Sequence, residues 1–325
     1  TAASTKGLPL MTEPDPNAKP SRSSLEETYK LIKDDITAAR ANLKTAGAAN
    51  SIYFTVDVID ALEARVDLYM HNYSSAVNLA KGLIANYPLD TDAEALTSMW
   101  LNDESSEIIY RTFQSVDERS NATGIYLSYS TATESFSPDF VPSQWVLDLY
   151  EEGDIRKDVF YRKDKITCLE VVTEDVYMLN KYPGNPALKK STYEYYHMAK
   201  VFRSAEAYLI AAEASYVNND ETNALKYSDD LRTQRGASEI AATGTELFKE
   251  IKNEWIREFI GEGQRMNDIK RWHDGVQRSN PQQESLVMTG SDYITLSKTA
   301  DDMRIVWEIP NNDLNANSNL EGNWK

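Results

Sequence analysis

The sequence has very little of the residue types that build disulfide frameworks and metal centres. Cys168 is the single cysteine among 325 residues, so an intramolecular disulfide is excluded and a buried structural thiol is the default interpretation. The three histidines, His71, His197 and His273, lie far apart and outside any metal-binding motif. The thirteen glycines are scattered, which excludes a phosphate-cradling loop. We therefore expect neither a metal nor a cofactor.

Long apolar runs and basic charge are also scarce. No apolar run approaches the roughly 18 residues of a transmembrane helix. The chain carries 34 basic and 51 acidic residues, which leaves a net charge of -17. Nucleic acid and anionic membrane surfaces are therefore poor partners on electrostatic grounds.

Aromatic residues, in contrast, are plentiful. Nineteen tyrosines and six tryptophans provide amphipathic surface that suits stacking on sugar rings and equally suits the packing of helices. The composition alone does not decide between the two. No nucleophile elbow accompanies them, so a binding or docking module is favoured over an enzyme.

Two segments carry the spacing of a helical-hairpin repeat. Ala64, Ala76 and Pro88 stand twelve residues apart, as the small packing positions and terminal proline of a tetratricopeptide repeat do. A shift of 148 residues maps Ala64 onto Ala212 and Ala76 onto Ala224. We predict a mainly α fold, a single domain over residues 1–325. Its hairpins lie at about 50–88 and 200–235, and a loop-rich binding region with a few short strands lies at about 100–200.

An amphipathic helix is predicted in the stretch from Leu247 to Trp272. Phe248, Ile251, Trp255 and Phe259 form its apolar stripe. Two glycines flank Glu262, and glycine inside a helix costs about 1 kcal/mol relative to alanine. We therefore expect a break or a close approach of the backbone at this point.

The same stretch carries a row of acids, Glu254, Glu258 and Glu262, at i, i+4 and i+8. Aligned carboxylates can act as an acid/base pair, as in glycoside hydrolysis. They can also form an ion-pair lattice that joins the helix to a neighbour. The lattice is favoured, because cations alternate with the acids and no flanking sequence indicates a cleft.

The pattern E-x3-E-F-x2-E-G-x-R-x2-D-I-x-R-W resembles the C-terminal signature of the SusD/RagB-like family, the cell-surface glycan-binding lipoproteins of Bacteroidetes-type bacteria. The matching structural positions here are Glu254, Glu258, Glu262, Gly263, Arg265, Asp268, Arg271 and Trp272. Trp255 and Met266 depart from it, since an arginine and an aromatic residue are usual there. Shorter matches elsewhere involve Asp154 and Arg156, the Lys181–Tyr182 pair, Arg203, and an I-P-N-N-D-L tail in which Ser318 replaces a proline.

The resemblance implies a SusD-like α-α superhelix and a protein that binds glycans on the cell surface. It further implies delivery of the glycan to a partner TonB-dependent, SusC-like transporter in the outer membrane. Contact with the membrane would come only through an N-terminal lipid anchor that this sequence does not contain. Residues 7–10, Gly-Leu-Pro-Leu, match the family's G-x-P-L segment, which usually lies well inside the protein. We therefore expect an N-terminal portion to be missing from this chain.

The sugar-contacting residues of the family lie outside its shared motifs, so the resemblance assigns none. Aromatic identity in loop-like sequence makes Tyr126, Tyr129, Trp145 and Tyr182 the candidates for ligand binding, with packing as the alternative role of each. Two other functions stay open. One is a tetratricopeptide-type adaptor without affinity for sugar, and the other is a glycoside hydrolase that uses Glu258 or Glu262.

Overall fold

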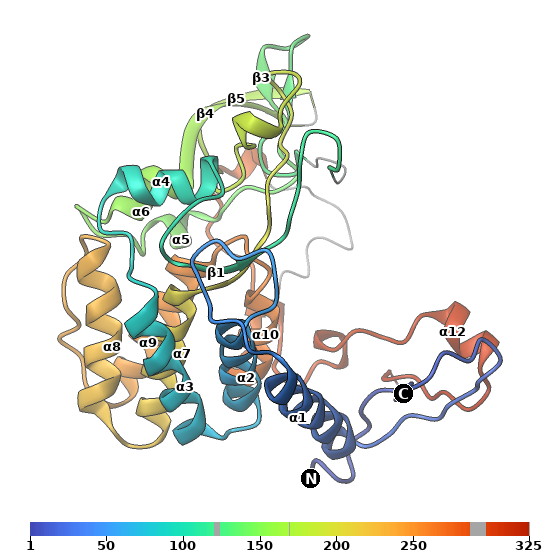
Figure 1. The fold of residues 1–325 in the computed structure, drawn as a ribbon. Helices are drawn as coiled ribbons and strands as arrows, with labels where there is room; N and C mark the ends of the chain where they lie inside the picture. The colour runs from blue at the N-terminus through green and yellow to red at the C-terminus, as the bar shows by residue number, and fades with distance from the viewer. Residues whose placement is uncertain (120–123, 169, 287–296, 325) are drawn as a thin grey trace. The chain divides into compact units, whose positions relative to one another are not determined.

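The computed structural model describes residues 1–119, 124–168, 170–286 and 297–324, and it is mainly helical with short strands (Figure 1). The described residues form two compact units. One consists of Thr1–Lys44, Met266–Gln277 and the described residues from 297 onward, and the other consists of the described residues within 45–265 and 278–286. The prediction of a single domain over residues 1–325 stays a prediction. Among the described helices, none has the length and apolarity needed to cross a membrane.

Two helical hairpins dominate the larger unit. The first pairs α2 (Val56–Tyr69) with α3 (Tyr73–Asn86), and the second pairs α7 (Ser204–Val217) with α8 (Glu221–Gln234). The shift of 148 residues seen in the sequence maps every one of these boundaries of the first hairpin onto the second. The two turns correspond as well, because His71 and Asn219 both adopt a positive φ, of 63° and 60°. Each hairpin therefore closes with the same backbone geometry.

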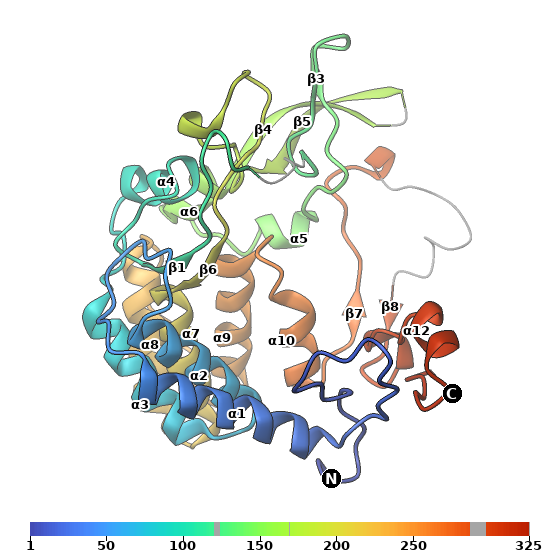
Figure 2. The ribbon, with the colours of Figure 1, turned by 45° about the vertical axis from the view of Figure 1, so that its right-hand side comes forward.

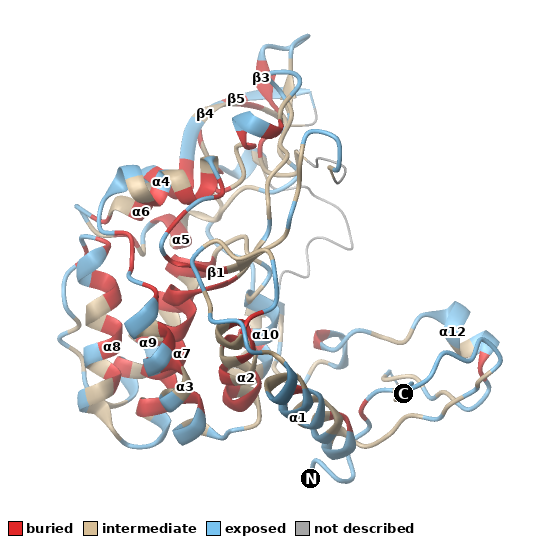
Figure 3. Ribbon diagram, viewed as in Figure 1, coloured by how far each residue is buried: buried red, intermediate tan, exposed pale blue. Residues whose placement is uncertain are grey.

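Small residues allow these helices to pack closely. The four alanines that the repeat comparison singled out are completely buried: Ala64, Ala76, Ala212 and Ala224. Helix α3 packs on α7, and α9 (Gly244–Phe259) covers both α7 and α8. Figure 3 shows the buried faces of these helices turned toward one another.

The other end of the larger unit is built from strands and short helices (Figures 1 and 2). Its four-stranded sheet has the order β2-β3-β4-β5, and β1 pairs separately with β6. The bounds are β1 (Ile108–Arg111), β2 (Tyr129–Ser130), β3 (Ser135–Phe136), β4 (Tyr161–Cys168), β5 (Val171–Leu179), β6 (Lys200–Arg203), α4 (Ala93–Leu101), α5 (Gln144–Leu147), α6 (Ile155–Phe160), η1 (Pro186–Leu188) and η2 (Glu284–Leu286).

The core of this end surrounds Trp100, which packs with Phe160 and Leu179. One expectation from the sequence is wrong here. Cys168 ends β4, where it is only half-buried, and is not a buried structural thiol. Since the sheet pairs Cys168 with Val171, the residue lies at the open tip of the β4–β5 hairpin, away from the core.

The predicted break after the amphipathic helix is present. Helix α9 ends at Phe259, and Gly261 and Gly263 both adopt a positive φ, of 75° and 80°. A Cβ atom on Gly261 would lie only 2.2 Å from the Leu179 side chain. Gly261 is therefore required both for its left-handed backbone and for the close approach of β5. The chain resumes as α10 (Arg265–Trp272).

The smaller unit contains the N-terminal segment, most of α10 and the C-terminal tail. Helix α1 (Leu25–Asn42) begins with a capping box between Ser24 and Glu27. Arg22 joins the two ends of the chain, since its guanidinium donates to the Gly7 carbonyl at 2.8 Å and to Asn323 Oδ1 at 2.7 Å. The remaining elements are β7 (Val276–Gln277), β8 (Ser297–Lys298), η3 (Met303–Ile305) and α12 (Asn311–Ala316).

Candidate functional site

The acid row lies at the centre of a buried ion-pair network, with Glu254 and Glu258 on α9 and Glu262 just beyond the end of that helix. Glu254 and Glu258 are completely buried, and the Glu262 side chain is nearly so. Glu258 bonds Arg203 at 2.6 Å and Arg156 at 3.0 Å, and Glu262 bonds Arg203 at 2.7 Å. The three carboxylates thus form the lattice that the sequence favoured over an acid/base pair.

The cations of this network come from separate segments of the chain. They are Arg156 on α6, Lys181 after β5, Arg203 at the end of β6, Arg232 on α8 and Arg235 just after it, and Arg257 on α9. Arg156, Lys181 and Arg203 are residues that the family resemblance marked. Their role is therefore to join these segments to α9 through buried charge pairs.

The network keeps its central carboxylates ionised. Burial alone raises the pKa of Glu254, but Arg156, Arg257 and Arg232 outweigh it and lower that pKa to about 2. The pKa of Glu258 is likewise held well below its ordinary value, because Arg235, Arg203 and Arg156 outweigh the effect of burial. A carboxyl group held in this way is not a proton donor near neutral pH. This arrangement disfavours a general acid on α9.

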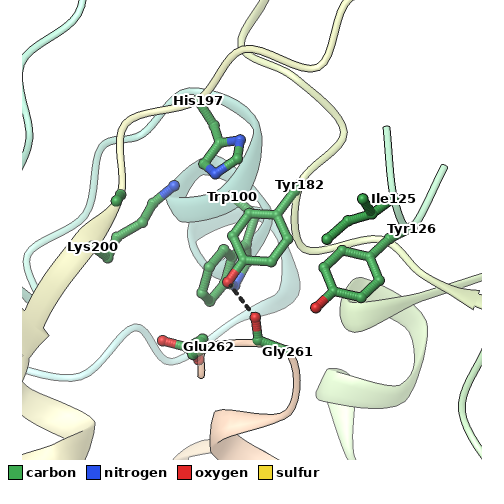
Figure 4. Close-up of a pocket in the computed structure, with 9 residues that line it drawn as sticks. Trp100, Ile125, Tyr126, Tyr182, His197, Lys200, Gly261 and Glu262 are labelled. Atoms are coloured by element: carbon green, nitrogen blue, oxygen red, sulfur yellow. Dashed lines mark hydrogen bonds between the residues drawn. The ribbon is translucent and has the colours of Figure 1, made fainter. Parts of the chain in front are cut away.

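A cavity of about 280 Å³ opens directly beyond the end of α9 (Figure 4). Gly261 and Glu262 form one side of it, because the glycine break turns the backbone away from the helix axis. The other residues that line it come from four distant parts of the sequence: Trp100, Ile125, Tyr126, Tyr182, His197, Ala199 and Lys200.

Two of the predicted candidates meet in this cavity. The rings of Tyr126 and Tyr182 are stacked, with centroids 5.9 Å apart and planes 24° apart. The Tyr182 hydroxyl donates to the Gly261 carbonyl at 3.0 Å, which fixes its ring (Figure 4). Both tyrosines also pack against the core around Trp100, whose ring meets Tyr182 edge to face at 5.7 Å. They combine a packing role with an aromatic wall in the cavity.

Polar groups lie on the other side of Tyr182 from Tyr126, as Figure 4 shows. Lys200 donates to the buried carboxylate of Asp103, so its charge is balanced. His197 Nδ1 lies 3.0 Å from the Tyr195 carbonyl oxygen, and it donates to this oxygen in the tautomer that carries the proton on Nδ1. Burial lowers the pKa of the imidazole. His197 is therefore neutral near pH 7, with Nε2 as an acceptor. The cavity combines aromatic faces with hydrogen-bonding groups and no unbalanced charge.

The other two candidates lie outside this cavity. Tyr129 on β2 stacks on Tyr193, with centroids 4.5 Å apart, and meets Phe136 edge to face at 5.0 Å. Trp145 is half-buried on α5 and does not line this cavity. The sequence missed Trp100, His197 and Lys200. Aromatic identity indicated Tyr126 and Tyr182, but nothing local distinguishes Trp100 from an ordinary core residue of α4.

The rest of the signature lies beyond the glycine break. Asp268 and Arg271 form an ion pair of 2.9 Å within α10, and both side chains are nearly buried. Arg265 is exposed, and Trp272 is half-buried. Over the described ranges, no group of three or more His, Cys, Asp or Glu side chains is placed to hold a metal ion.

Comparison with known proteins gives consistent results. The sequence profile of the SusD family matches residues 63–324. No match was found among curated proteins. A solved SusD superfamily protein from Bacteroides thetaiotaomicron is 25% identical, with a TM-score of 0.80 over 99% of this chain and 72% of its own.

Two further solved structures share the fold at lower identity. A SusD-like carbohydrate binding protein from Bacteroides vulgatus is 22% identical, with a TM-score of 0.77 over 97% of this chain and 70% of its own. Surface glycan-binding protein A from Bacteroides uniformis is 18% identical, with a TM-score of 0.71 over 99% of this chain and 74% of its own. The predicted SusD-like, mainly α fold is thereby confirmed.

Proposed function

The chain belongs to the SusD family, and from this premise we propose that it is a surface glycan-binding protein that captures sugars in the cavity beyond α9. The observation that carries the proposal is the stacked pair of Tyr126 and Tyr182 beside neutral hydrogen-bonding groups. Aromatic rings bind the apolar faces of sugar rings, and polar neighbours bind the hydroxyls. The cavity of about 280 Å³ suits one or two sugar units at a time.

The solved relatives support this proposal at the level of fold. Two proteins with the same architecture are a SusD-like carbohydrate binding protein and a surface glycan-binding protein. The ion-pair network supports binding over hydrolysis, because Glu258 and Glu262, the carboxylates that a hydrolase would use, are each held by two or more cations. Tyr129 and Trp145 remain candidates for contacts with longer glycans.

We further propose that the bound glycan passes to a SusC-like, TonB-dependent transporter, and that the natural protein is a lipoprotein on the outer surface of the outer membrane. The family resemblance supports this part of the proposal. Complex formation with a SusC-like transporter would test it. Replacement of the cavity tyrosines should leave such a complex intact if sugar binding and docking use different surfaces.

Affinity electrophoresis against plant, host-mucin and microbial polysaccharides tests the proposed function, with the release of reducing sugar followed in the same samples. We expect one class to retard the chain without release of sugar. Release of sugar would establish a hydrolase instead. A chain that no polysaccharide retards, but that binds the transporter, would be the adaptor.

The variant Tyr126→Ala connects the binding to the cavity. We expect it to weaken retardation by the bound class at least tenfold, which corresponds to roughly 1.4 kcal/mol of lost stacking. Phe113→Ala is the matched control, because Phe113 is 54% exposed and does not line the cavity. Equal retardation of the two variants would place the sugar elsewhere.

A further inference from the structure

A second recess of about 310 Å³ adjoins the sugar cavity. The two share Tyr126 and Gly261 as lining residues, so they adjoin at these two residues. The recess is lined by Tyr126, Phe140, Val141, Pro142, Leu179, Ile260 and Gly261.

The chemistry of this recess differs from that of the sugar cavity. Its side chains carry one polar atom, the hydroxyl oxygen of Tyr126. Two of its backbone carbonyls are already occupied, since Gly261 accepts from Tyr182 at 3.0 Å and Pro142 accepts from Gln282 at 2.9 Å. A sugar ring placed here would leave most of its hydroxyls without partners, at a cost of about 1–3 kcal/mol for each. The recess is therefore unsuited to a second sugar unit.

The recess is nevertheless built to receive an apolar group. Phe140 at its rim is 63% exposed, which leaves a large aromatic ring in water beside an apolar wall. Volume permits such a group as well, because an apolar cavity of roughly 150 Å³ is enough to bind benzene. An acyl or aryl group would cover Phe140 and displace water from Val141 and Leu179.

We infer that the chain takes a glycan that carries an apolar substituent. The sugar lies against Tyr126 and Tyr182, and its acyl or aryl group passes over Tyr126 into the recess beside Phe140. This inference rests on the proposed function, because the recess gains its selectivity only from a sugar held in the neighbouring cavity. Tyr126 then contacts both parts of the ligand.

Matched pairs of small glycosides test the inference. Methyl and 4-nitrophenyl β-D-glycosides of glucose, xylose, galactose, mannose and N-acetylglucosamine would be titrated by ligand-observed NMR, with 4-nitrophenol alone as a control. For the sugar that is bound, we expect the aryl glycoside to bind about tenfold more tightly than the methyl glycoside. Free 4-nitrophenol should bind far more weakly than the aryl glycoside.

Variants locate the effect. Phe140→Ser should reduce the aryl preference to about twofold and leave the affinity for the methyl glycoside unchanged. Val141→Thr keeps the shape of the side chain and replaces one methyl group with a hydroxyl, so it should also reduce the aryl preference. It tests the recess independently of whether Phe140→Ser folds well. Phe113→Ser is the control, because Phe113 is similarly exposed and lines neither cavity, and it should keep the full preference.

The possible failures are distinguishable. Equal affinity for the methyl and aryl glycosides of a bound sugar would overturn the inference and leave the proposed function standing. An aryl preference that survives both recess variants would have the same consequence. Binding of 4-nitrophenol as tight as that of the aryl glycoside would also overturn it. If neither member of any pair binds and no polysaccharide retards the chain, the proposed function itself fails, and the inference fails with it.

Discussion

At the scale of single residues, Glu258 shows why the acid row stabilises the fold. Its carboxylate bonds Arg156, Arg203 and Arg235, which lie on three different segments, and no part of it reaches solvent. Desolvation makes the net value of such a pair small, but removal of one partner leaves the others buried and uncompensated. Each charged side chain of the network therefore stabilises the fold by compensating the buried charges around it.

We expect Glu258→Gln to lower the free energy of unfolding by about 3–5 kcal/mol, because it leaves three buried arginines short of one negative charge. Urea unfolding followed by circular dichroism measures the loss. Glu246→Gln is the matched control, since its pair with Lys249 at 3.2 Å is exposed and should contribute less than about 1 kcal/mol. A stable Glu258→Gln variant that had lost the release of reducing sugar would instead indicate a catalytic carboxylate.

Glu254 makes the stability depend on pH in the acid range. Its pKa in the folded protein, about 2, lies below the ordinary value of 4.5, so the folded state binds its proton less tightly than the unfolded state does. The stabilisation is therefore complete above pH 4.5 and is lost as the pH falls toward 2.

A comparison of the wild type with Glu254→Gln can assign this loss of stability to Glu254. We expect the stability gap between the wild type and Glu254→Gln to narrow by an amount on the order of 3 kcal/mol between pH of about 6 and about 2.5. Urea unfolding at a series of pH values would show it, since the other acids titrate alike in both proteins. A gap that stays constant over that range would mean that the pKa of Glu254 is the same in the folded and the unfolded protein.

At the scale of elements, the two hairpins depend on the same small residues. Ala64 on α2 and Ala212 on α7 are completely buried at corresponding positions. We expect Ala64→Leu and Ala212→Leu to cost about 1–3 kcal/mol each, because a close-packed helix interface has no room for three more carbon atoms. Differential scanning calorimetry measures both.

Ala85→Leu on α3 is the control, because Ala85 is exposed. It should change the stability by less than about 0.5 kcal/mol. If both buried substitutions were as neutral as this one, the alanines would not be packing positions, and the correspondence of the hairpins would have no energetic meaning.

Elements with a strong local pattern could be predicted from the sequence. The hairpins were predicted from the twelve-residue spacing of small residues, and the break at Gly261 from the two glycines that flank Glu262. The sequence predicted only a few short strands between about residues 100 and 200, whereas β4 and β5 extend over eight and nine residues. Its length follows from pairing between strands and from packing on the core, which local propensity does not encode.

At the scale of the whole molecule, the candidate site could be predicted only in part. The acid row was visible because its three members follow one another at four-residue spacing in the sequence, but its cations come from as far away as Arg156. The cavity beyond α9 likewise joins Trp100, Tyr126, Tyr182 and Lys200, which approach one another only in the folded chain. Aromatic identity therefore indicated two of the residues that line this cavity, Tyr126 and Tyr182, and gave no way to find the rest.

The distribution of charge over the molecule predicts how salt affects the binding of glycans. The chain has a net charge of -17, yet the charged groups at the cavity are paired internally, Lys200 with Asp103 and Glu262 with Lys181 and Arg203. Stacking and neutral hydrogen bonds are insensitive to ionic screening, whereas the repulsion of an anionic polysaccharide by the whole chain is strong only at low salt. A neutral glycan should therefore be the preferred ligand, with an affinity almost independent of salt.

We expect the affinity for the neutral polysaccharide that retards the chain to change by less than about twofold between roughly 50 and 500 mM NaCl. Isothermal titration calorimetry at the two salt concentrations measures it. An anionic polysaccharide of similar length is the control, and any binding of it should strengthen as salt screens the repulsion. A steep loss of affinity for the bound glycan on addition of salt would mean that an unbalanced cation holds the ligand, because only attraction between opposite charges is weakened in that way.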